Sequence, residues 1–162
     1  MTKTLCLIRH ANAEENHASG KDFERRLASS GIQEARRLGE YFSKEDILPD
    51  LIVASPSRRT RETAVLIGEV MGLPPKIFLY RDEIYEGLAS SLLEVIGETA
   101  EVIKTLFLVG HNPGISELVG LLGAELASGL HKAEALALRW ENSTWKSLPV
   151  GKPKVLFQFR PG

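Results

Sequence analysis

Short apolar runs alternate along this chain with segments in which apolar residues recur every three or four positions. The runs are typical of strands buried in a parallel sheet, and the recurring positions are typical of helices with one apolar face. Alternating strands and helices predict an α/β fold with a largely parallel sheet and antiparallel pairs near the end. The segments expected to form strands are 5–8, 50–55, 76–80, 105–109, 135–140 and 154–159. The segments expected to form helices are 30–42, 57–71, 92–100 and 115–122.

The local sequence also predicts where three helices begin. Ser30 and Gln33 have the spacing of a capping box, which places the serine at the N-cap. Ser55 and Asn112 each follow a predicted strand and precede a proline, and proline at the first helical position loses no hydrogen bond. Two helix N-termini are therefore expected at the carboxyl edge of the sheet, where their unpaired N–H groups favour anions.

Charged and titratable residues follow three of the predicted strands. Arg9 and His10 end the first strand, Arg59 follows the second, and His111 follows the strand at 105–109. Each residue alone has a structural alternative, as a salt-bridged arginine or a hydrogen-bonded histidine at a strand end. Because ligands bind outside the carboxyl ends of parallel strands, one shared site accounts for all four residues together.

Two arginines and two histidines around one point suit a phosphoryl group. The guanidinium fork matches phosphate oxygens, and a histidine ring can act as a covalent nucleophile. Spacing alone does not decide whether His10 or His111 is the nucleophile. A metal site formed by the two histidines and a loop carboxylate is an alternative, but Arg9 and Arg59 would repel the cation. We therefore expect neither a metal nor a cofactor.

Four segments carry a resemblance to a known family, and they occur in the order found in that family. They are Leu7-Ile8-Arg9-His10-Ala11, then 22–27 followed by Gly31, then 55–64, and finally Val109-Gly110-His111-Asn112-Pro113-Gly114. Together they resemble the histidine phosphatase superfamily, and most closely its short SixA-type branch of phosphohistidine phosphatases. Many members have glycine after the first histidine; Ala11 stands there in this chain, and we expect it only to restrict the turn.

The resemblance implies both a fold and a reaction. The implied fold is a three-layer sandwich, with a largely parallel central sheet flanked by helices as in phosphoglycerate mutases. The implied reaction is phosphate hydrolysis through a covalent phosphohistidine on His10, with Arg9, Arg59 and His111 binding the phosphate.

Further site residues lie in two loops. In larger members of the superfamily a glutamate after the third strand protonates the leaving group, and here Glu83 is the first candidate and Glu86 the second. Both could instead be solvated loop carboxylates. Asn12 and Arg25, from the loop 12–26, are candidate phosphate ligands, although Arg25 could equally be a solvated surface charge.

Composition limits the class of protein. A chain of 162 residues can bury a sizeable core, so we expect a single histidine phosphatase domain over residues 1–162. The formal net charge of −1 argues against a nucleic-acid partner. The single cysteine indicates a reducing, cytoplasmic location without disulfides, and no apolar span reaches the length that crosses a membrane.

The resemblance implies that the substrate is phosphohistidine on a protein, such as a histidine-containing phosphotransfer domain. Two alternatives stay open: a phosphomonoesterase that acts on a small phosphorylated metabolite, and a phosphate-binding module without turnover. Binding alone needs no nucleophile, so the presence of His10 argues against the module. Turnover of p-nitrophenyl phosphate would discriminate between an enzyme and a binding module.

Overall fold

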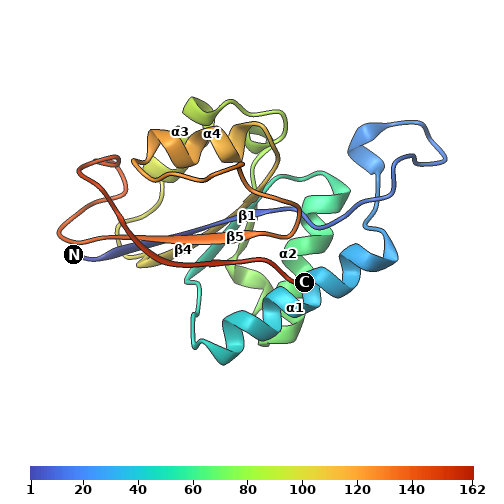
Figure 1. Cartoon of the computed structure of the whole chain (residues 1–162), viewed down its shortest axis with the longest axis horizontal. Coiled ribbons are helices and arrows are strands. Elements are labelled where there is room, and N and C mark those ends of the chain that lie inside the picture. The colour runs from blue at the N-terminus through green and yellow to red at the C-terminus, as the bar shows by residue number, and fades with distance from the viewer.

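The computed structural model describes all residues, 1–162, and its centre is one six-stranded sheet (Figure 1). The strand order across the sheet is β3-β2-β4-β1-β5-β6. The first four of these strands are parallel to one another, whereas β5 is antiparallel to both β1 and β6. The predicted sheet, largely parallel with antiparallel pairs near the end, is confirmed. The strands are β1 Lys3–Arg9, β2 Leu51–Ala54, β3 Phe78–Tyr80, β4 Thr105–Gly110, β5 Ala135–Trp140 and β6 Lys154–Phe159.

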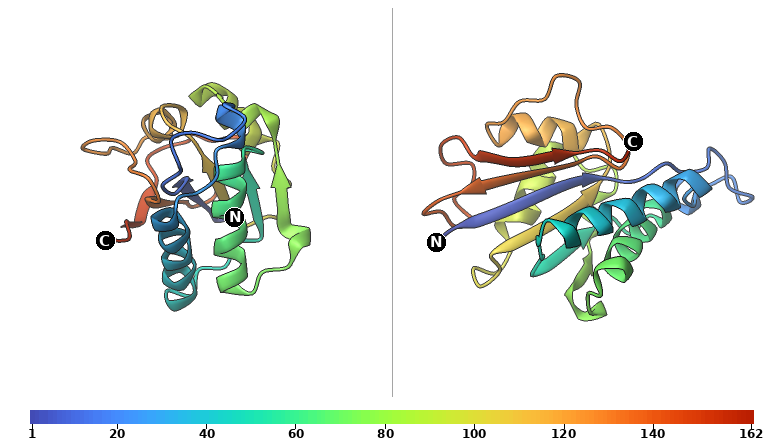
Figure 2. Two further views of the ribbon diagram at one scale, coloured as in Figure 1. Left: turned by 90° about the vertical axis from the view of Figure 1, so that its right-hand side faces the viewer. Right: turned by 60° about the horizontal axis from the view of Figure 1, so that its bottom comes forward.

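Helices cover both faces of the sheet, as Figures 1 and 2 show. Successive side chains of β1 point to opposite faces of the sheet, which explains the two helical layers. Leu5 and Leu7 pack in one core, while Cys6 and Ile8 pack in the other. The first core lies beneath α3 and α4, and the second lies beneath α1 and α2. The three-layer sandwich is therefore confirmed. The helices are α1 Ser29–Lys44, α2 Arg58–Met71, α3 Ala89–Gly97 and α4 Gly114–Leu121.

The start of α1 differs from the prediction. Ala28, not Ser30, occupies the N-cap, because the carbonyl of Ala28 accepts the first helical hydrogen bond from the N–H of Ile32 at 3.0 Å. Ser30 lies inside the first turn, and its hydroxyl accepts a hydrogen bond from the Asn12 side chain at 2.9 Å. The capping-box prediction is wrong because this serine bonds the loop after β1 instead of its own helix.

The two proline junctions also begin their helices later than predicted. The helix α2 has Ser57 as its N-cap and α4 has Pro113, so neither proline is the first helical residue. At the first junction the Ser55 hydroxyl accepts a hydrogen bond from the N–H of Ser57 at 3.3 Å, which adds a turn before α2. Both junctions still lie at the carboxyl edge of the sheet, after β2 and β4.

Candidate active site

The strand order brings three chain segments together at one edge of the sheet. Arg9 at the end of β1 pairs with Gly110 at the end of β4, and Ala54 of β2 pairs with Val109 on the other side of β4. The residues that follow these strand ends therefore meet, although they lie far apart in the sequence. They are His10, Ser55 and His111.

His10 is buried, with 6% of its surface exposed, and its ring has a defined tautomer. Its Nδ1 lies 2.8 Å from the backbone carbonyl oxygen of Ala11. A carbonyl oxygen only accepts hydrogen bonds, so Nδ1 carries the proton and Nε2 keeps its lone pair. Burial and the positive charges of Arg59 and Arg9 lower the pKa of His10 to about 4, against the opposing effect of the Ala11 bond. The ring is therefore neutral at neutral pH.

Arg9 and Arg59 each have a buried N–H group without a hydrogen-bond partner, the Nε of the guanidinium. The other ends of both side chains are fixed by the protein. Nη1 of Arg9 donates to the carbonyl of Leu130 at 3.2 Å, and Nη1 of Arg59 donates to the carbonyl of Asp22 at 2.9 Å. A buried donor left without a partner costs about 1–3 kcal/mol, so two such donors beside His10 indicate an anion-binding site.

His111 lies against His10, with ring centroids 5.4 Å apart. Its Nδ1 is 3.3 Å from Nη2 of Arg59, and because a guanidinium only donates, Nδ1 accepts. Its Nε2 then carries the proton and donates to the hydroxyl of Ser55 at 2.8 Å. Burial, followed by the positive charge of Arg59, lowers the pKa of His111 to about 3. The second ring is therefore also neutral, in the opposite tautomer.

Asp22 and Tyr85 connect two loops across the mouth of the site. The Oδ2 of Asp22 accepts hydrogen bonds from the Tyr85 hydroxyl at 2.8 Å and from Nη2 of Arg59 at 3.1 Å. Burial opposes ionisation of Asp22, but the Tyr85 bond and the charge of Arg59 outweigh it and lower the pKa to about 2. This carboxylate is therefore ionised at any pH near neutral.

The first turns of α2 hold the loop that follows β1. The hydroxyl of Thr63 accepts a hydrogen bond from the N–H of Ala11 at 3.1 Å, and the carboxylate of Glu62 accepts one from the N–H of Leu27 at 2.8 Å. The helix that carries Arg59 thus also positions the backbone next to His10.

A hollow of about 450 Å³ opens in front of Arg59 and His111. The loop after β3 forms one wall of it, through Tyr85 to Leu88, and residues 112–114 form another. Its size and its polar floor are suited to the part of a substrate that carries a phosphoryl group.

Comparison with known families agrees with this geometry. A family model of the histidine phosphatase superfamily (branch 1) matches residues 5–102, a stretch that includes Arg9, His10 and Arg59. The chain belongs to the histidine phosphatase superfamily.

The relatives by sequence and by structure support the SixA-type branch of the histidine phosphatases. Phosphohistidine phosphatase SixA of Escherichia coli K12 is 28% identical to this chain, and the aligned region covers 76% of this chain and 73% of the relative. An uncharacterized chloroplastic protein of Arabidopsis thaliana is also 28% identical, and the aligned region covers 93% of this chain and 75% of that protein. A crystal structure of a candidate phosphohistidine phosphatase SixA from Agrobacterium tumefaciens has a TM-score of 0.84 at 25% identity, over 99% of both chains.

Glu83, the first candidate for the general acid of this histidine phosphatase, does not line the hollow. Its carboxylate pairs with Arg81, which also binds Glu98 at 3.1 Å, and this hydrogen bonding lowers the pKa of Glu83. The second candidate, Glu86, lines the hollow. Position therefore favours Glu86 over Glu83 for contact with a leaving group.

Asn12 and Arg25 bond mainly to neighbouring parts of the protein. The Asn12 side chain donates to Ser30 and accepts from Nζ of Lys132 at 3.2 Å. Arg25 donates to Asp22 at 2.9 Å and to the carbonyl of Glu14 at 3.0 Å. Both residues border the site of this histidine phosphatase, and neither lines the hollow in front of Arg59.

The sequence reasoning missed Asp22, Ser55 and Tyr85 as contributors to the site. Asp22 and Ser55 both lie in the segments that resemble the family, but their partners are distant in sequence: Arg59 and Tyr85 for Asp22, and His111 for Ser55. No local pattern identifies such pairs, because each side chain is ordinary for a polar loop.

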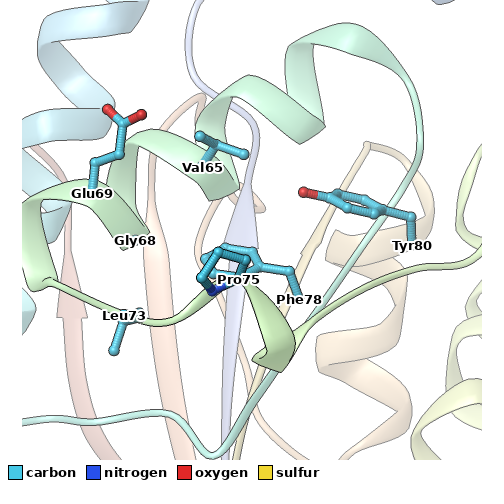
Figure 3. Close-up of a pocket in the computed structure, with 7 residues that line it drawn as sticks. All are labelled: Val65, Gly68, Glu69, Leu73, Pro75, Phe78 and Tyr80. Carbon is cyan, nitrogen blue, oxygen red and sulfur yellow. The ribbon is translucent and has the colours of Figure 1, made fainter.

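A second hollow, of about 320 Å³, lies between α2 and β3 and is shown in Figure 3. Val65, Leu73, Pro75 and Phe78 make it largely apolar, and Glu69 is its only charged side chain. It shares no residue with the hollow in front of Arg59 and His111. This second hollow is therefore separate from the candidate active site.

The structure contains no group of three or more histidine, cysteine, aspartate or glutamate side chains placed to hold a metal ion. No helix is both long enough and apolar enough to span a membrane.

Proposed function

We propose that this protein is a phosphatase that works through a covalent phosphohistidine on His10, and that its substrate is phosphohistidine on another protein. The observation that carries the proposal is the free Nε2 of a neutral His10 beside two buried, unpartnered N–H groups, those of Arg9 and Arg59. A nucleophile and two donors for phosphate oxygens thus meet at one point.

In the first step, Nε2 of His10 attacks phosphorus. The new N–P bond forms as the bond between phosphorus and the leaving group breaks, and the leaving group departs with that electron pair. The guanidinium groups of Arg9 and Arg59 hold the equatorial oxygens, where negative charge is spread in the transition state. The Ala11 carbonyl stabilises the positive charge that develops on the ring, because it accepts the hydrogen bond from Nδ1–H.

In the second step, water attacks the phosphorus of the phosphohistidine. The P–O bond forms, the N–P bond breaks with its electron pair returning to Nε2, and inorganic phosphate leaves. His10 is then again neutral, with its proton on Nδ1. Both protons of the attacking water leave on the inorganic phosphate, and the imidazole released in the first step takes up its proton from solvent.

The proposed substrate follows from the relatives and from the leaving group. The Escherichia coli relative is named a phosphohistidine phosphatase, and this chain covers most of its length. An imidazole leaves more readily than an alkoxide. Hydrolysis of phosphohistidine therefore depends less on a carboxylic acid that is positioned to protonate the leaving group, as in the larger enzymes. A histidine-containing phosphotransfer domain is the partner we propose. The second candidate, a small phosphorylated metabolite, is favoured by a hollow of only about 450 Å³.

Rapid-quench trapping with a labelled substrate tests the proposal. We expect an adduct that is labile in acid and stable in base, formed by the wild type and by His111→Ala but absent from His10→Ala. Turnover should fall roughly a thousandfold or more in His10→Ala, because the nucleophile is lost. An adduct that persists in His10→Ala and disappears in His111→Ala would assign the nucleophile to the second histidine. Tight phosphate binding without turnover of p-nitrophenyl phosphate would instead indicate a binding module.

A further inference from the structure

The hollow in front of Arg59 and His111 combines one positive charge, that of Arg59, with several carboxylates, which we call the acidic rim. Three carboxylates line it, from three separate segments of the chain: Asp22, Glu86 and Glu117. Asp22 is paired with Arg59 and Arg25, so its charge is largely offset. Glu86 and Glu117 are exposed and form no ion pair. The rim therefore carries uncompensated negative charge.

The direction of attack places the leaving group beside this rim. His10 does not line the hollow, but its ring lies 5.4 Å from the ring of His111, which does. Arg59, whose Nε has no hydrogen-bond partner, also lines the hollow, so a phosphoryl group bound to its guanidinium would lie at the edge of the hollow. Because phosphoryl transfer is roughly in line, a group leaving opposite His10 would extend into the hollow.

Arg59 is the only cationic side chain that lines the hollow. Lys132, which also lies near His10, comes from the loop before β5, and its Nζ donates to Asn12 at 3.2 Å. It does not line the hollow. Glu117 stands in the first turn of α4, where it also compensates the helix dipole, but that role leaves its charge facing the hollow.

We propose that Glu86 and Glu117 select the substrate by charge, favouring phosphoryl groups carried on a neutral or positively charged leaving group. Substrates with a second anionic group near the phosphate, such as a phosphorylated hydroxy acid or a bisphosphate, are disfavoured by like-charge repulsion. Imidazole, the leaving group of phosphohistidine, carries no negative charge once it takes up a proton. This selection rests on the proposed phosphatase function and narrows its substrate class.

Two matched aryl phosphates test the selection. Phosphorylated tyramine carries a cation, and phosphorylated 4-hydroxyphenylacetate carries an anion at a similar distance, on phenols of similar acidity. At low ionic strength we expect kcat/KM to be about tenfold higher for the cationic ester, mostly through KM, and the ratio to fall as salt is added. Equal rates, or faster hydrolysis of the anionic ester, would overturn the proposal.

The double variant Glu86→Gln/Glu117→Gln identifies the source of the preference. It should reduce the ratio between the two esters to about threefold or less, because only the charge of the rim is removed. Any effect of Glu86 on the chemical step is common to both esters and cancels in the ratio. The control is Glu40→Gln, on the exposed face of α1, which should leave the ratio unchanged. An unchanged ratio in the double variant would refute the role of these two glutamates.

Failure of the phosphatase proposal can be distinguished from failure of the selection. If the wild type hydrolyses neither these esters nor a phosphohistidine substrate, the proposed function is wrong. Whenever neither ester is turned over, the dissociation constants of the two matched aryl phosphonates are measured by calorimetry. Tighter binding of the cationic phosphonate, reduced in the double variant, would still support the acidic rim. Equal dissociation constants would overturn it.

Discussion

At the scale of single residues, hydrogen bonds from neighbouring groups determine which nitrogen of each active-site histidine carries the proton. The Ala11 carbonyl holds the proton of His10 on Nδ1, whereas Arg59 and Ser55 hold that of His111 on Nε2. One ring thus keeps a lone pair for attack. The other is a neutral ring whose Nδ1 accepts from Arg59, so a bound phosphate would compete with it for the same guanidinium.

The depressed pKa of His10 leads to a prediction about the pH dependence of activity. His10 must be neutral to attack, and its pKa is about 4. After correction for ionisation of the substrate, kcat/KM should therefore stay level from neutral pH to about pH 5 and decline below it, because this parameter reports the free enzyme. Steady-state rates on p-nitrophenyl phosphate measure this. A decline centred near the ordinary histidine pKa of 6.5 would contradict the assignment of a desolvated nucleophile.

The same pKa shift predicts that the protein loses stability in mild acid. Between pH 6.5 and about pH 4 the unfolded chain protonates this histidine and the folded protein does not, so the free energy of unfolding falls as pH falls. His10 alone would contribute up to about 2 kcal/mol of this loss at pH 5. Urea unfolding at pH 7 and pH 5 measures it, with His10→Gln as the comparison. A loss of the same size in His10→Gln would show that other groups cause it.

Glu83 allows a test of the general acid. Its carboxylate bonds Arg81 and does not line the hollow, so we expect Glu83→Gln to change hydrolysis of alkyl phosphates and of p-nitrophenyl phosphate by the same factor. A true general acid increases the rate of hydrolysis by a factor of about 10² to 10⁴ where the leaving group is poor, and by far less where nitrophenolate leaves. A selective loss on alkyl phosphates would restore Glu83 as the acid. Glu86→Gln, measured on both substrates, is the matched comparison.

At the scale of elements, the site depends on where helices approach the ends of strands. The helix α2 supplies Arg59 and also holds the backbone after β1 through Thr63. The helix α1 approaches the same backbone from the other side, where the carbonyl of Asn12 accepts a hydrogen bond from the N–H of Ala28 at 2.9 Å. The loop that carries His10 is therefore fixed by two helices of the same layer.

Gly31 makes the approach of α1 possible, and its replacement tests the role of that helix. A Cβ at this position would overlap the carbonyl oxygen of Asn12, so Gly31→Ala must displace either α1 or the loop after His10. We expect a loss of about 1–3 kcal/mol in urea unfolding, together with reduced activity. Gly120→Ala in α4 is the control, because its Cβ meets no atom within 4 Å. There we expect stability to stay constant or rise by up to about 1 kcal/mol; a similar loss in both variants would contradict the overlap.

At the scale of the whole molecule, the sheet order is what assembles the site. β1 lies between β4 and β5, and β4 lies between β1 and β2, so the ends of three parallel strands are neighbours. All six strands share this sheet, in keeping with the proposed single domain over residues 1–162. The cytoplasmic location stays a prediction; the only cysteine, Cys6, is buried and unpaired in the core.

Activity without a metal is a prediction for the whole protein. Arg9 and Arg59 supply the positive charge that a metal would otherwise bring to the phosphate, so activity should survive EDTA treatment and dialysis within about twofold. The control is an unrelated metal-dependent phosphatase treated in the same way. Activity that is lost and then restored by one divalent ion would mean that a metal takes part.

The class of fold, most of its elements and the four residues that we propose for the centre of the site were predictable from the sequence alone. These were predictable because each signal is local: a strand buried on both faces shows as a continuous apolar run, and a charged residue at its end is conspicuous. Choosing His10 over His111 as the nucleophile required the family resemblance, because the two histidines have equivalent positions after their strands.

The pairing of the side chains could not be predicted in this way, because it depends on the tertiary structure. Ser30 bonds Asn12 instead of capping α1, Asp22 reaches Arg59 and Tyr85, and Glu83 turns to Arg81. Polar side chains have several partners within reach, and the choice among them depends on which segments the fold brings together. The hydrophobic pattern fixes the layers because burial of apolar surface is non-directional, whereas a hydrogen bond requires two specific atoms at a specific distance.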